Sequence, residues 1–394
     1  MPDALAQMTK LRAWWWRKQG LDGQLTGSPP AEVLEKTGWI RSLGGVGPYL
    51  ALFARAGIRR PAVDAALKNL EIHELPAARN CTYVLPASDF ALGLKSGEGF
   101  AGGEEKVAMK LGVTEAELRR LRAGVKKALE KGPLEPDRLR DALGGLVRSL
   151  GEEGKKKGLS TTLPAALGRL QAGGEIRRVP TNGRLDQQRY QYTLWEPNPL
   201  EGFQLTAEEG SVELAHRYFR WAGPASSKEF QAFSGLGVKA AAAAMDRLKL
   251  VPPEPGSERW MEAEDKEAFD RFQTPREPQY ALAASLDGIA LLRRDLQSLL
   301  TPEDQERALG MRAGLKDWES HAILDRGRWI GSWEYDPDAE AIVWAVWVKK
   351  DKALEAAVKR TEEFVRQDLG DARGYGLDNP KSRAPRIALL KRGY

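Results

Sequence analysis

Residues 154–195, GKKKGLSTTLPAALGRLQAGGEIRRVPTNGRLDQQRYQYTLW, decide the fold that we expect for this chain. Apolar residues recur there at three- and four-residue spacings from Leu163 to Leu170. This periodicity predicts a helix over 161–172 that turns one apolar face toward a core. The Gly-Gly pair at 173–174 is expected to end that helix.

Two β-strands are expected after this helix, at 176–180 and 185–194. Thr-Asn-Gly at 181–183 separates them, and Asn-Gly suits a tight hairpin turn because both residues tolerate positive φ. Aromatic and polar side chains alternate over 189–194, as they do in a strand with one buried face. The whole stretch therefore predicts a helix followed by a half-buried hairpin.

Basic residues are concentrated on this predicted helix and hairpin. They are Lys155, Lys156 and Lys157 before the helix, Arg169 within it, and Arg177, Arg178, Arg184 and Arg189 on the hairpin. A helix followed by a basic hairpin is the geometry of a winged helix, in which the helix enters a DNA groove and the wing follows the backbone. The alternative is a solvated lysine run and an arginine-rich edge that resists aggregation.

The composition of the 394 residues excludes several classes of protein. A chain that is 42% hydrophobic and 29% charged is typical of globular proteins and long enough for two to four domains. It lacks a signal-peptide core and any apolar run near the ~18 residues of a membrane span, so we expect a cytoplasmic, nucleoid-associated protein without membrane contact. One cysteine, Cys81, and three histidines predict no disulfide, metal site or cofactor.

The charge is distributed unevenly along the chain. The formal net charge is +5 and the sequence pI is about 9.1. Residues 1–200 hold 31 Lys and Arg against 22 Asp and Glu, whereas residues 201–394 hold 29 against 33. The basic half therefore contains 154–195, as expected if that half faces a polyanion.

An internal repeat relates the middle of the chain to the segment that follows it. GPLEPDRLRDAL at 132–143 and GPASSKEFQAFS at 223–234 share a Gly-Pro start and later acidic and apolar positions. Each follows a predicted long helix and precedes a predicted helix and hairpin. Two copies of one unit are expected, and helices before a hairpin candidate at 72–85 suggest a divergent third.

The C-terminal part differs in character from Tyr280 onward. Four tryptophans suit the core of a small barrel, namely Trp329, Trp333, Trp344 and Trp347. A helix is predicted over 353–369, and the basic residues at 373–394 are expected to form an irregular tail.

The expected fold class is α+β, with three tandem winged-helix domains and a small C-terminal β-barrel. The winged helices are expected at 1–96, 104–200 and 205–265. The barrel, with its helix and tail, is expected at 275–394. Glycine-rich residues 97–103 are the expected linker after the first domain.

Arranged in this order, the chain resembles the winged-helix DNA glycosylases that unhook alkylated bases and crosslinks, the AlkZ/YcaQ-like family. The motifs that carry the resemblance are PYLALFAR at 48–55, ELPAARNCTYVLPASDFAL at 74–92, LPAALGRLQAGGEIRRV at 163–179, RYFRWAGPASSKEFQAFSGL at 217–236, SLDGIALLRRD at 285–295 and DRGRWIGSW at 325–333. The resemblance implies three winged helices and a barrel around a concave DNA-binding surface.

The resemblance also implies a reaction, the hydrolysis of the N-glycosidic bond of an N7-alkylated purine. In the family a Gln-x-Gln or Gln-x-Asp pair holds the attacking water. Because the alkylated base is already cationic and leaves readily, such an enzyme mainly has to position water and stabilise an oxocarbenium-like sugar.

The sequence departs from the family where that pair is expected, shortly before 48–55. Residues 38–48 contain no Gln, Asp, Asn or Glu, and their polar side chains are Arg41 and Ser42. A second departure lies in the family pattern Arg-Gly-Thr-x-His, of which only Arg79 remains; Asn80, Cys81 and Tyr83 replace the other residues. No catalytic residue is therefore assigned from the sequence.

Other polar residues have simpler interpretations. Gln187, Gln188 and Gln191 could be displaced catalytic amides, but on a hairpin we expect them to contact phosphate or solvent. Asp89 is expected to cap a helix. Asp287 resembles an acidic position of the family's barrel segment, and its role stays open.

The expected partner is double-stranded DNA, bound by a monomer without a cofactor. The predicted DNA-binding residues are Arg59, Arg60, Arg79, Lys155, Lys156, Lys157, Arg169, Arg177, Arg178, Arg184, Gln188 and Arg189. Three hypotheses remain. The chain is a DNA-binding member of the family that acts on alkylated or otherwise damaged DNA, an active glycosylase with substitute residues, or a transcription factor or scaffold without the chemistry.

Overall fold

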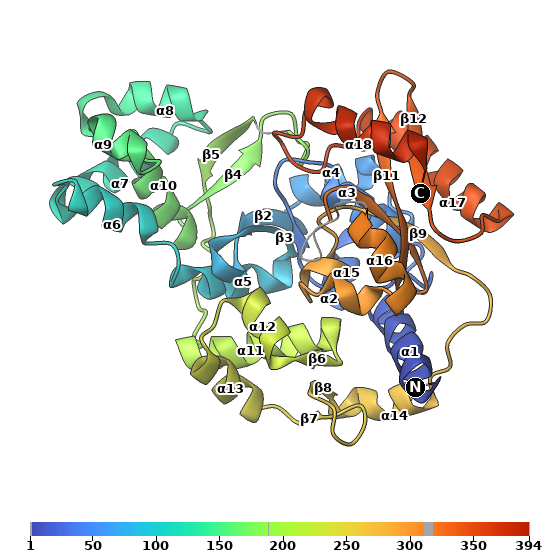
Figure 1. Ribbon diagram of the computed structural model, residues 1–394. Coiled ribbons are helices and arrows are strands. Elements are labelled where there is room, and N and C mark those ends of the chain that lie inside the picture. The colour runs from blue at the N-terminus through green and yellow to red at the C-terminus, as the bar shows by residue number, and fades with distance from the viewer. Residues whose placement is uncertain (1, 188, 311–317, 394) are drawn as a thin grey trace.

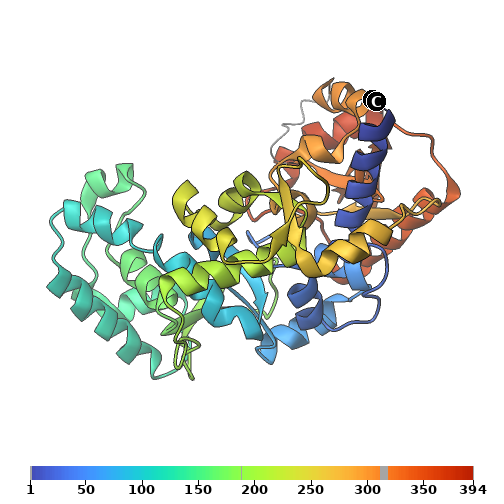
Figure 2. The same ribbon diagram turned by 90° about the horizontal axis from the view of Figure 1, so that it is seen from below.

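The structure is a computed structural model that describes residues 2–187, 189–310 and 318–393. It is a mixed α/β chain in which a helical part, including α6 (Gly103–Lys110) and α10 (Leu163–Ala172), projects to one side. The C-terminal sheet lies at the opposite side (Figure 1), and the view from below gives the same separation (Figure 2). Within the described ranges, no helix is both long enough and apolar enough to cross a membrane.

The first unit follows α1 (Pro2–Lys18) and precedes α5 (Phe90–Glu98). Its elements are α2 (Pro30–Thr37), β1 (Ile40–Arg41), α3 (Gly47–Ala56), α4 (Arg60–Lys68), β2 (Ile72–Pro76) and β3 (Thr82–Pro86). The three strands form an antiparallel sheet in the order β1-β3-β2.

The third unit repeats this order of elements. It consists of α11 (Ala207–Ala222), β6 (Ala225–Ser226), α12 (Ser227–Ser234), α13 (Val238–Asp246), β7 (Leu250–Val251) and β8 (Arg259–Glu262). Its sheet has the order β6-β8-β7, so the last strand again lies between the other two.

The middle unit has the same plan with an insertion. Its elements are α7 (Glu115–Leu129), α8 (Pro136–Leu143), α10, β4 (Ile176–Pro180) and β5 (Tyr190–Leu194), and α9 (Gly151–Lys156) is inserted before α10. Leu134 bridges Tyr192 of β5 in the place of a first strand. The Gly-Pro segments of the sequence repeat therefore occupy equivalent places, directly before Leu134 and directly before β6.

Local sequence signals start the long helices of these units. Thr114 and Thr206 each accept a hydrogen bond from the backbone N–H three residues later, at Glu117 and Glu209. Each glutamate reaches back to the backbone N–H of its threonine. This reciprocal capping box satisfies amide groups that a helix leaves unpaired at its start.

The hairpin of the middle unit is shorter than the sequence predicts. The second strand begins at Tyr190, and a strand starting at Leu185 is wrong. The Leu185 backbone N–H donates to the Tyr49 hydroxyl (3.0 Å), and its side chain is buried in the core of the first unit. The described residues between the strands, 181–187 and 189, are therefore anchored to another unit through Leu185, and an Asn-Gly turn signal does not predict such a contact.

The C-terminal sheet is open, and the closed barrel expected from the sequence is wrong for the described strands. They are β9 (Tyr280–Ala283), β10 (His321–Asp325), β11 (Arg328–Asp336) and β12 (Ala341–Val346), in the order β12-β11-β10-β9. The sheet does not close on itself, and helices pack against it. Helix α17 (Lys352–Phe364, continued by Val365–Leu369) contacts β9 and β12. Helix α18 (Pro380–Arg392) contacts β11 and β12. The connecting helices are α14 (Ala263–Arg271), α15 (Gly288–Leu291) and α16 (Pro302–Gly310).

The segment expected to be an irregular tail forms α18 and is attached to the sheet. Arg383 is fully buried and donates to the Asp371 carboxylate at 2.7 and 3.0 Å. Arg386 bonds Glu334 at 2.6 Å and Asp378 at 2.8 Å. The basic charge that suggested an irregular tail is thus neutralised by a carboxylate of β11 and by two carboxylates just before the helix.

Two acidic residues singled out in the sequence have structural roles. The Asp287 carboxylate accepts hydrogen bonds from both Nη atoms of Arg55, at 2.7 and 2.8 Å. This buried ion pair connects α15 to α3. Asp89 makes no capping bond, so the predicted helix cap is wrong. Its carboxylate instead accepts from Trp39 Nε1 (2.8 Å) and Arg217 Nε (3.1 Å), because the buried indole and guanidinium need an acceptor there.

Candidate functional cleft

One face of the first unit's sheet carries polar side chains at the end that lies next to the middle unit. Val84 pairs with both Ile40 and Glu74, and Ile40 and Val84 are buried in the core. Thr82 lies on the same face as Val84, because strand side chains alternate between faces. Ser42 continues β1 beside it, since the Ser42 backbone N–H donates to the Thr82 carbonyl at 3.1 Å. Hydroxyl and carboxylate groups therefore share the end of this face.

Glu74 is the carboxylate at this end. The Ser42 hydroxyl donates to its Oε1 at 2.5 Å, and Arg178 Nη2 of β4 lies 3.4 Å from its Oε2. The Arg178 guanidinium lies over the Tyr190 ring, 4.9 Å from its centroid. The Glu74 side chain is 18% exposed, so its carboxylate is shielded but still accessible.

Two adjoining cavities open at these residues, and together we call them the cleft. The smaller, of about 410 Å³, is lined by Ser42, Leu43, Gly44, Glu74, Thr82, Arg178, Gln187 and Tyr190. The larger, of about 570 Å³, lies between the β2–β3 turn and α10. Thr82, Arg178 and Tyr190 line both cavities, so the two cavities are neighbours with a shared wall.

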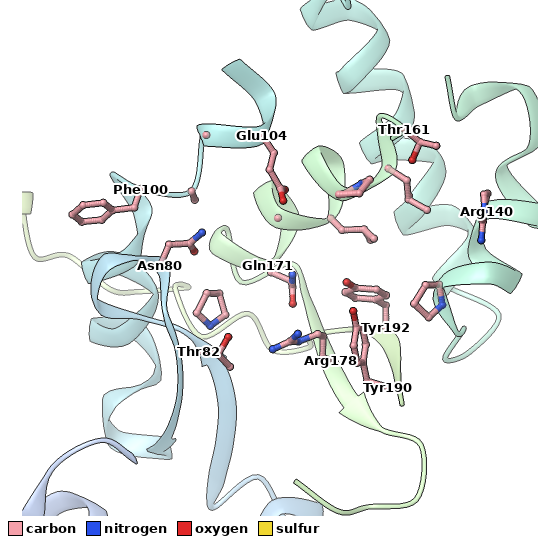
Figure 3. A pocket seen from close by; sticks show the side chains of 18 residues that line it. Asn80, Thr82, Phe100, Glu104, Arg140, Thr161, Gln171, Arg178, Tyr190 and Tyr192 are labelled. Carbon is pink, nitrogen blue, oxygen red and sulfur yellow. The ribbon is translucent and has the colours of Figure 1, made fainter. Parts of the chain in front are cut away.

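The larger cavity is walled by α10 and by aromatic residues of β5. Five residues of the helix line it, namely Leu163, Pro164, Leu167, Gly168 and Gln171. The apolar face of α10 packs on α7, so the helix is fixed by the core of the middle unit. Tyr190 and Tyr192 stand edge to face, 5.5 Å apart, beside Arg178 (Figure 3). Flat rings and amide groups in such a wall suit a planar polar ligand.

The charges around the cleft are set by burial and by close partners. Burial lowers the pKa of Arg178, but Glu74 and the two tyrosines outweigh it, so the pKa of Arg178 lies above its ordinary value. Partial burial raises the pKa of Glu104 in the larger cavity. Behind the sheet, burial and the nearby arginines lower the pKa of His73 to about 3. His73 is therefore neutral at physiological pH.

The turn between β2 and β3 reaches into the cleft in a strained conformation. Arg79 and Asn80 have φ of 58° and 55°, a left-handed conformation that is costly for residues other than glycine. Arg79 lies against Gly235, where an added Cβ would come within 2.5 Å of Arg79 Cγ. The third unit thus supports the turn from behind, and Asn80 lines the larger cavity.

The glycine-rich loop beside Glu74 is held by the C-terminal segment. The Val46 backbone N–H donates to the Arg373 carbonyl (3.0 Å), and the Gly376 N–H donates to the Leu43 carbonyl (2.9 Å). A Cβ at Gly45 would come within 2.5 Å of the Gly374 backbone, so glycine is required for this approach. The loop has a defined path past the cleft although residues 38–48 supply neither an amide nor a carboxylate side chain.

The structure brings only some of the predicted DNA-binding residues to the cleft. Arg178 lines it. Arg177 is the preceding residue of β4, so its side chain lies on the opposite face of the strand. Arg79 lies at its turn. Lys155, Lys156, Lys157, Arg169 and Arg189 are exposed outside it, and Lys155 and Lys156 pair with Glu152 and Glu153. Gln188 lies outside the described residues.

Three other residues predicted to bind DNA form ion pairs with carboxylates of the protein itself. Arg184 bonds Asp186, Arg60 bonds Asp64, and Arg59 bonds Asp368. All the predicted DNA contacts stay predictions, and these three would have to release a carboxylate to bind phosphate. Sequence reasoning also missed Glu74, although it lies in a quoted family motif, because its neighbours come from residues far away in sequence.

Comparison with known proteins identifies the family. Residues 46–366 match the family described as DNA glycosylase AlkZ-like. This chain therefore belongs to the AlkZ-like DNA glycosylase family. Among solved structures it is similar to the Streptomyces sahachiroi DNA glycosylase AlkZ, with a TM-score of 0.69 and 18% identity over 93% of this chain and 98% of that chain. At that identity the likeness establishes a common fold. No curated protein matches significantly.

Proposed function

We propose that this protein binds double-stranded DNA and hydrolyses the N-glycosidic bond of an alkylated purine. In this proposal its three repeated units are winged helices, and the damaged nucleotide is turned out of the duplex into the cleft. Enzymes that act on a base must extrude it in this way, because the reacting atoms are buried in the base stack.

The observation that carries the proposal is the composition of the cleft. A carboxylate, hydroxyls and amides line two adjoining cavities, and tyrosine rings form one wall. The volume of the larger cavity, about 570 Å³, is in the range of sites for small molecules.

Binding to the DNA backbone is assigned to basic residues outside the cavities. The exposed lysines before α10, Arg169 on that helix and Arg189 at the hairpin project from the middle unit. Cations of this kind neutralise phosphates and fix the position of a protein on the duplex without reading its sequence. Such binding suits a protein that searches for lesions.

The proposal is tested by release of the modified base. Duplex DNA alkylated at guanine N7 is incubated with protein, and free N7-methylguanine is measured by mass spectrometry against a protein-free sample. A panel of bulkier N7 adducts and crosslinks extends the test. Release from at least one substrate is expected; no release across the panel contradicts the proposal.

A second function is favoured by residues 38–48, which lack the amide pair of the family. The chain would then be a winged-helix transcription factor or scaffold without catalysis. Sequence-specific binding to undamaged DNA distinguishes this alternative, since direct base readout discriminates between sequences whereas lesion search does not.

A further inference from the structure

The cleft contains one carboxylate with an uncommitted oxygen close to the family's catalytic segment. Glu74 Oε1 is bonded to the Ser42 hydroxyl at 2.5 Å. In the described part of the chain, Oε2 has only the long 3.4 Å contact with Arg178 Nη2. A carboxylate oxygen can accept two hydrogen bonds, so Oε2 has capacity for a further donor.

We infer that Glu74 is the catalytic carboxylate of this chain and, with Ser42, replaces the amide pair that holds water in the family. The inference rests on the proposed glycosylase function and names the residue that performs it. Ser42 belongs to the segment that lacks the family's amides, and its bond brings the carboxylate of β2 to that segment.

The surroundings hold Glu74 in one orientation. Its backbone, on the edge strand β2, is paired with Val84 of the central strand β3. Ser42 is 1% exposed and therefore has little freedom to turn away. Arg178 lies over the Tyr190 ring, and its 3.4 Å contact with Oε2 keeps this oxygen at the cavity. Groups fixed in this way need little reorganisation during the reaction.

The reaction balances with these groups and water alone. The water oxygen attacks C1′ of the deoxyribose, and the C1′–N9 bond breaks with its electron pair passing to the cationic base, which leaves as a neutral alkylpurine. The water proton passes to Glu74, and solvent later removes it. The products are an abasic site and the free base. The Glu74 charge also stabilises the positive sugar that develops as the bond breaks.

Gln187 and Glu104 are weaker candidates for this role. Gln187 also lines the smaller cavity, where its amide could hold a water molecule but could not take its proton. Glu104 lines the larger cavity and is exposed, and the raised pKa of its carboxyl favours the protonated form. Neither residue is joined to residues 38–48 by a hydrogen bond in the described structure.

The test is a single-turnover measurement of base release by the full chain and by Glu74→Gln. Glutamine keeps the size and an acceptor for Ser42 but cannot accept the water proton. We expect a loss of at least about 100-fold in the rate constant, with DNA affinity unchanged within about twofold. Glu71→Gln is the matched control, because Glu71 is an exposed glutamate just before β2. Its rate should equal that of the wild type.

A binding measurement tests the same charge without turnover. Duplexes carrying a cationic pyrrolidine or a neutral tetrahydrofuran in place of the damaged nucleoside mimic the charged sugar and its uncharged form. The wild type should prefer the cationic analogue by about tenfold, and Glu74→Gln should lose that preference. Thermal melting confirms that each variant is folded, and Glu74→Asp, with the charge kept but the reach shortened, should give an intermediate rate.

The outcomes separate the two proposals. A folded Glu74→Gln variant that releases base within about threefold of the wild-type rate overturns the role of Glu74 but leaves the glycosylase function intact. A wild type that releases no base from any substrate overturns both. If Glu74→Gln does not fold, a Glu74→Asp variant with the full wild-type rate and preference for the cationic analogue overturns the inference.

Discussion

The first and third units share one order of elements and one order of strands, but each contains a glutamate whose carboxylate has a different set of hydrogen-bond donors. Glu229 of the third unit accepts from Arg259 at 2.6 and 2.7 Å and from the Ser226 backbone N–H at 2.5 Å, with Arg293 3.7 Å away. Glu74 of the first unit has the Ser42 hydroxyl at 2.5 Å and one arginine, Arg178, at 3.4 Å. Both oxygens of Glu229 have close donors, whereas Oε2 of Glu74 lies at a cavity and can still accept a hydrogen bond from a ligand.

At neutral pH, the largest effect on stability is expected from removing the Glu229 carboxylate, which has close donors on both oxygens. Burial alone would raise the pKa of Glu229, but Arg293 and Arg259 outweigh it and hold the pKa below its ordinary value of 4.5. Glu229→Gln leaves the buried Arg293 without its carboxylate, so the free energy of unfolding should fall by about 3 kcal/mol. Chemical denaturation measures this loss, and base release by the folded variant should match the wild type.

The same substitution should change the response to acid. Because the folded pKa of Glu229 is depressed, its stabilisation is present above about pH 4.5 and is lost as the pH falls through the folded pKa. The unfolding free energy of Glu229→Gln should therefore depend less on pH below 4.5 than that of the wild type. An equal acid dependence in both proteins would contradict the assignment of this pair.

The next prediction concerns the exposed cations of the middle unit. Replacing Lys157, Arg169 and Arg189 together with alanine should weaken binding to any duplex by roughly 30-fold and reduce the salt slope by up to about 3. Fluorescence anisotropy at several salt concentrations measures both. Unchanged affinity would remove these residues from the DNA-binding surface. The paired Arg59, replaced by alanine, provides a comparison outside the middle unit.

A smaller effect is expected for the residue that positions the carboxylate. Ser42→Ala should lower the single-turnover rate by about tenfold, because Glu74 then loses the bond that orients it. In the Glu74→Gln background the same change should have no effect, since there is no carboxylate left to position. Equal losses in both backgrounds would mean that Ser42 contributes only to folding.

A separate effect, confined to acid pH, is expected behind the cleft. The pKa of His73 is lowered from 6.5 to about 3, mainly by burial. The unfolded chain therefore binds a proton that the folded chain rejects, and stability should fall by up to about 1.4 kcal/mol per pH unit as the pH drops from 6.5 toward 3. His73→Phe should flatten this part of the stability curve. A variant with unchanged pH dependence would show that His73 does not titrate on unfolding.

Much of the fold could be predicted because its signals are local. The apolar spacing from Leu163 to Leu170 predicted α10, and the Gly-Pro segments predicted the shared order of the middle and third units. Four errors arose from contacts between distant residues: Leu185 is anchored on Tyr49, Asp89 bonds Trp39 and Arg217, α18 is attached to β11 through Arg386, and helices cover the sheet that was expected to close. Spacing along the chain carries no information about such partners.

The candidate site was predictable only in part for the same reason. The basic hairpin and Arg178 were recognised from local composition, and the absence of an amide pair was evident from residues 38–48. Glu74 could not be singled out, because its meaning depends on Ser42, which is 32 residues away, and on Arg178, which is 104 residues away. Only the folded chain places the three side chains at one cavity.

The central claim is that the unsaturated carboxylate of the first unit performs N-glycosidic hydrolysis. The most direct measurement is the amount of free N7-methylguanine released from alkylated duplex DNA by the wild type and by Glu74→Gln under single-turnover conditions. The account predicts rapid release by the wild type and a rate at least about 100-fold lower for the folded variant at unchanged DNA affinity. Equal release by the two proteins, or none by the wild type, would contradict it.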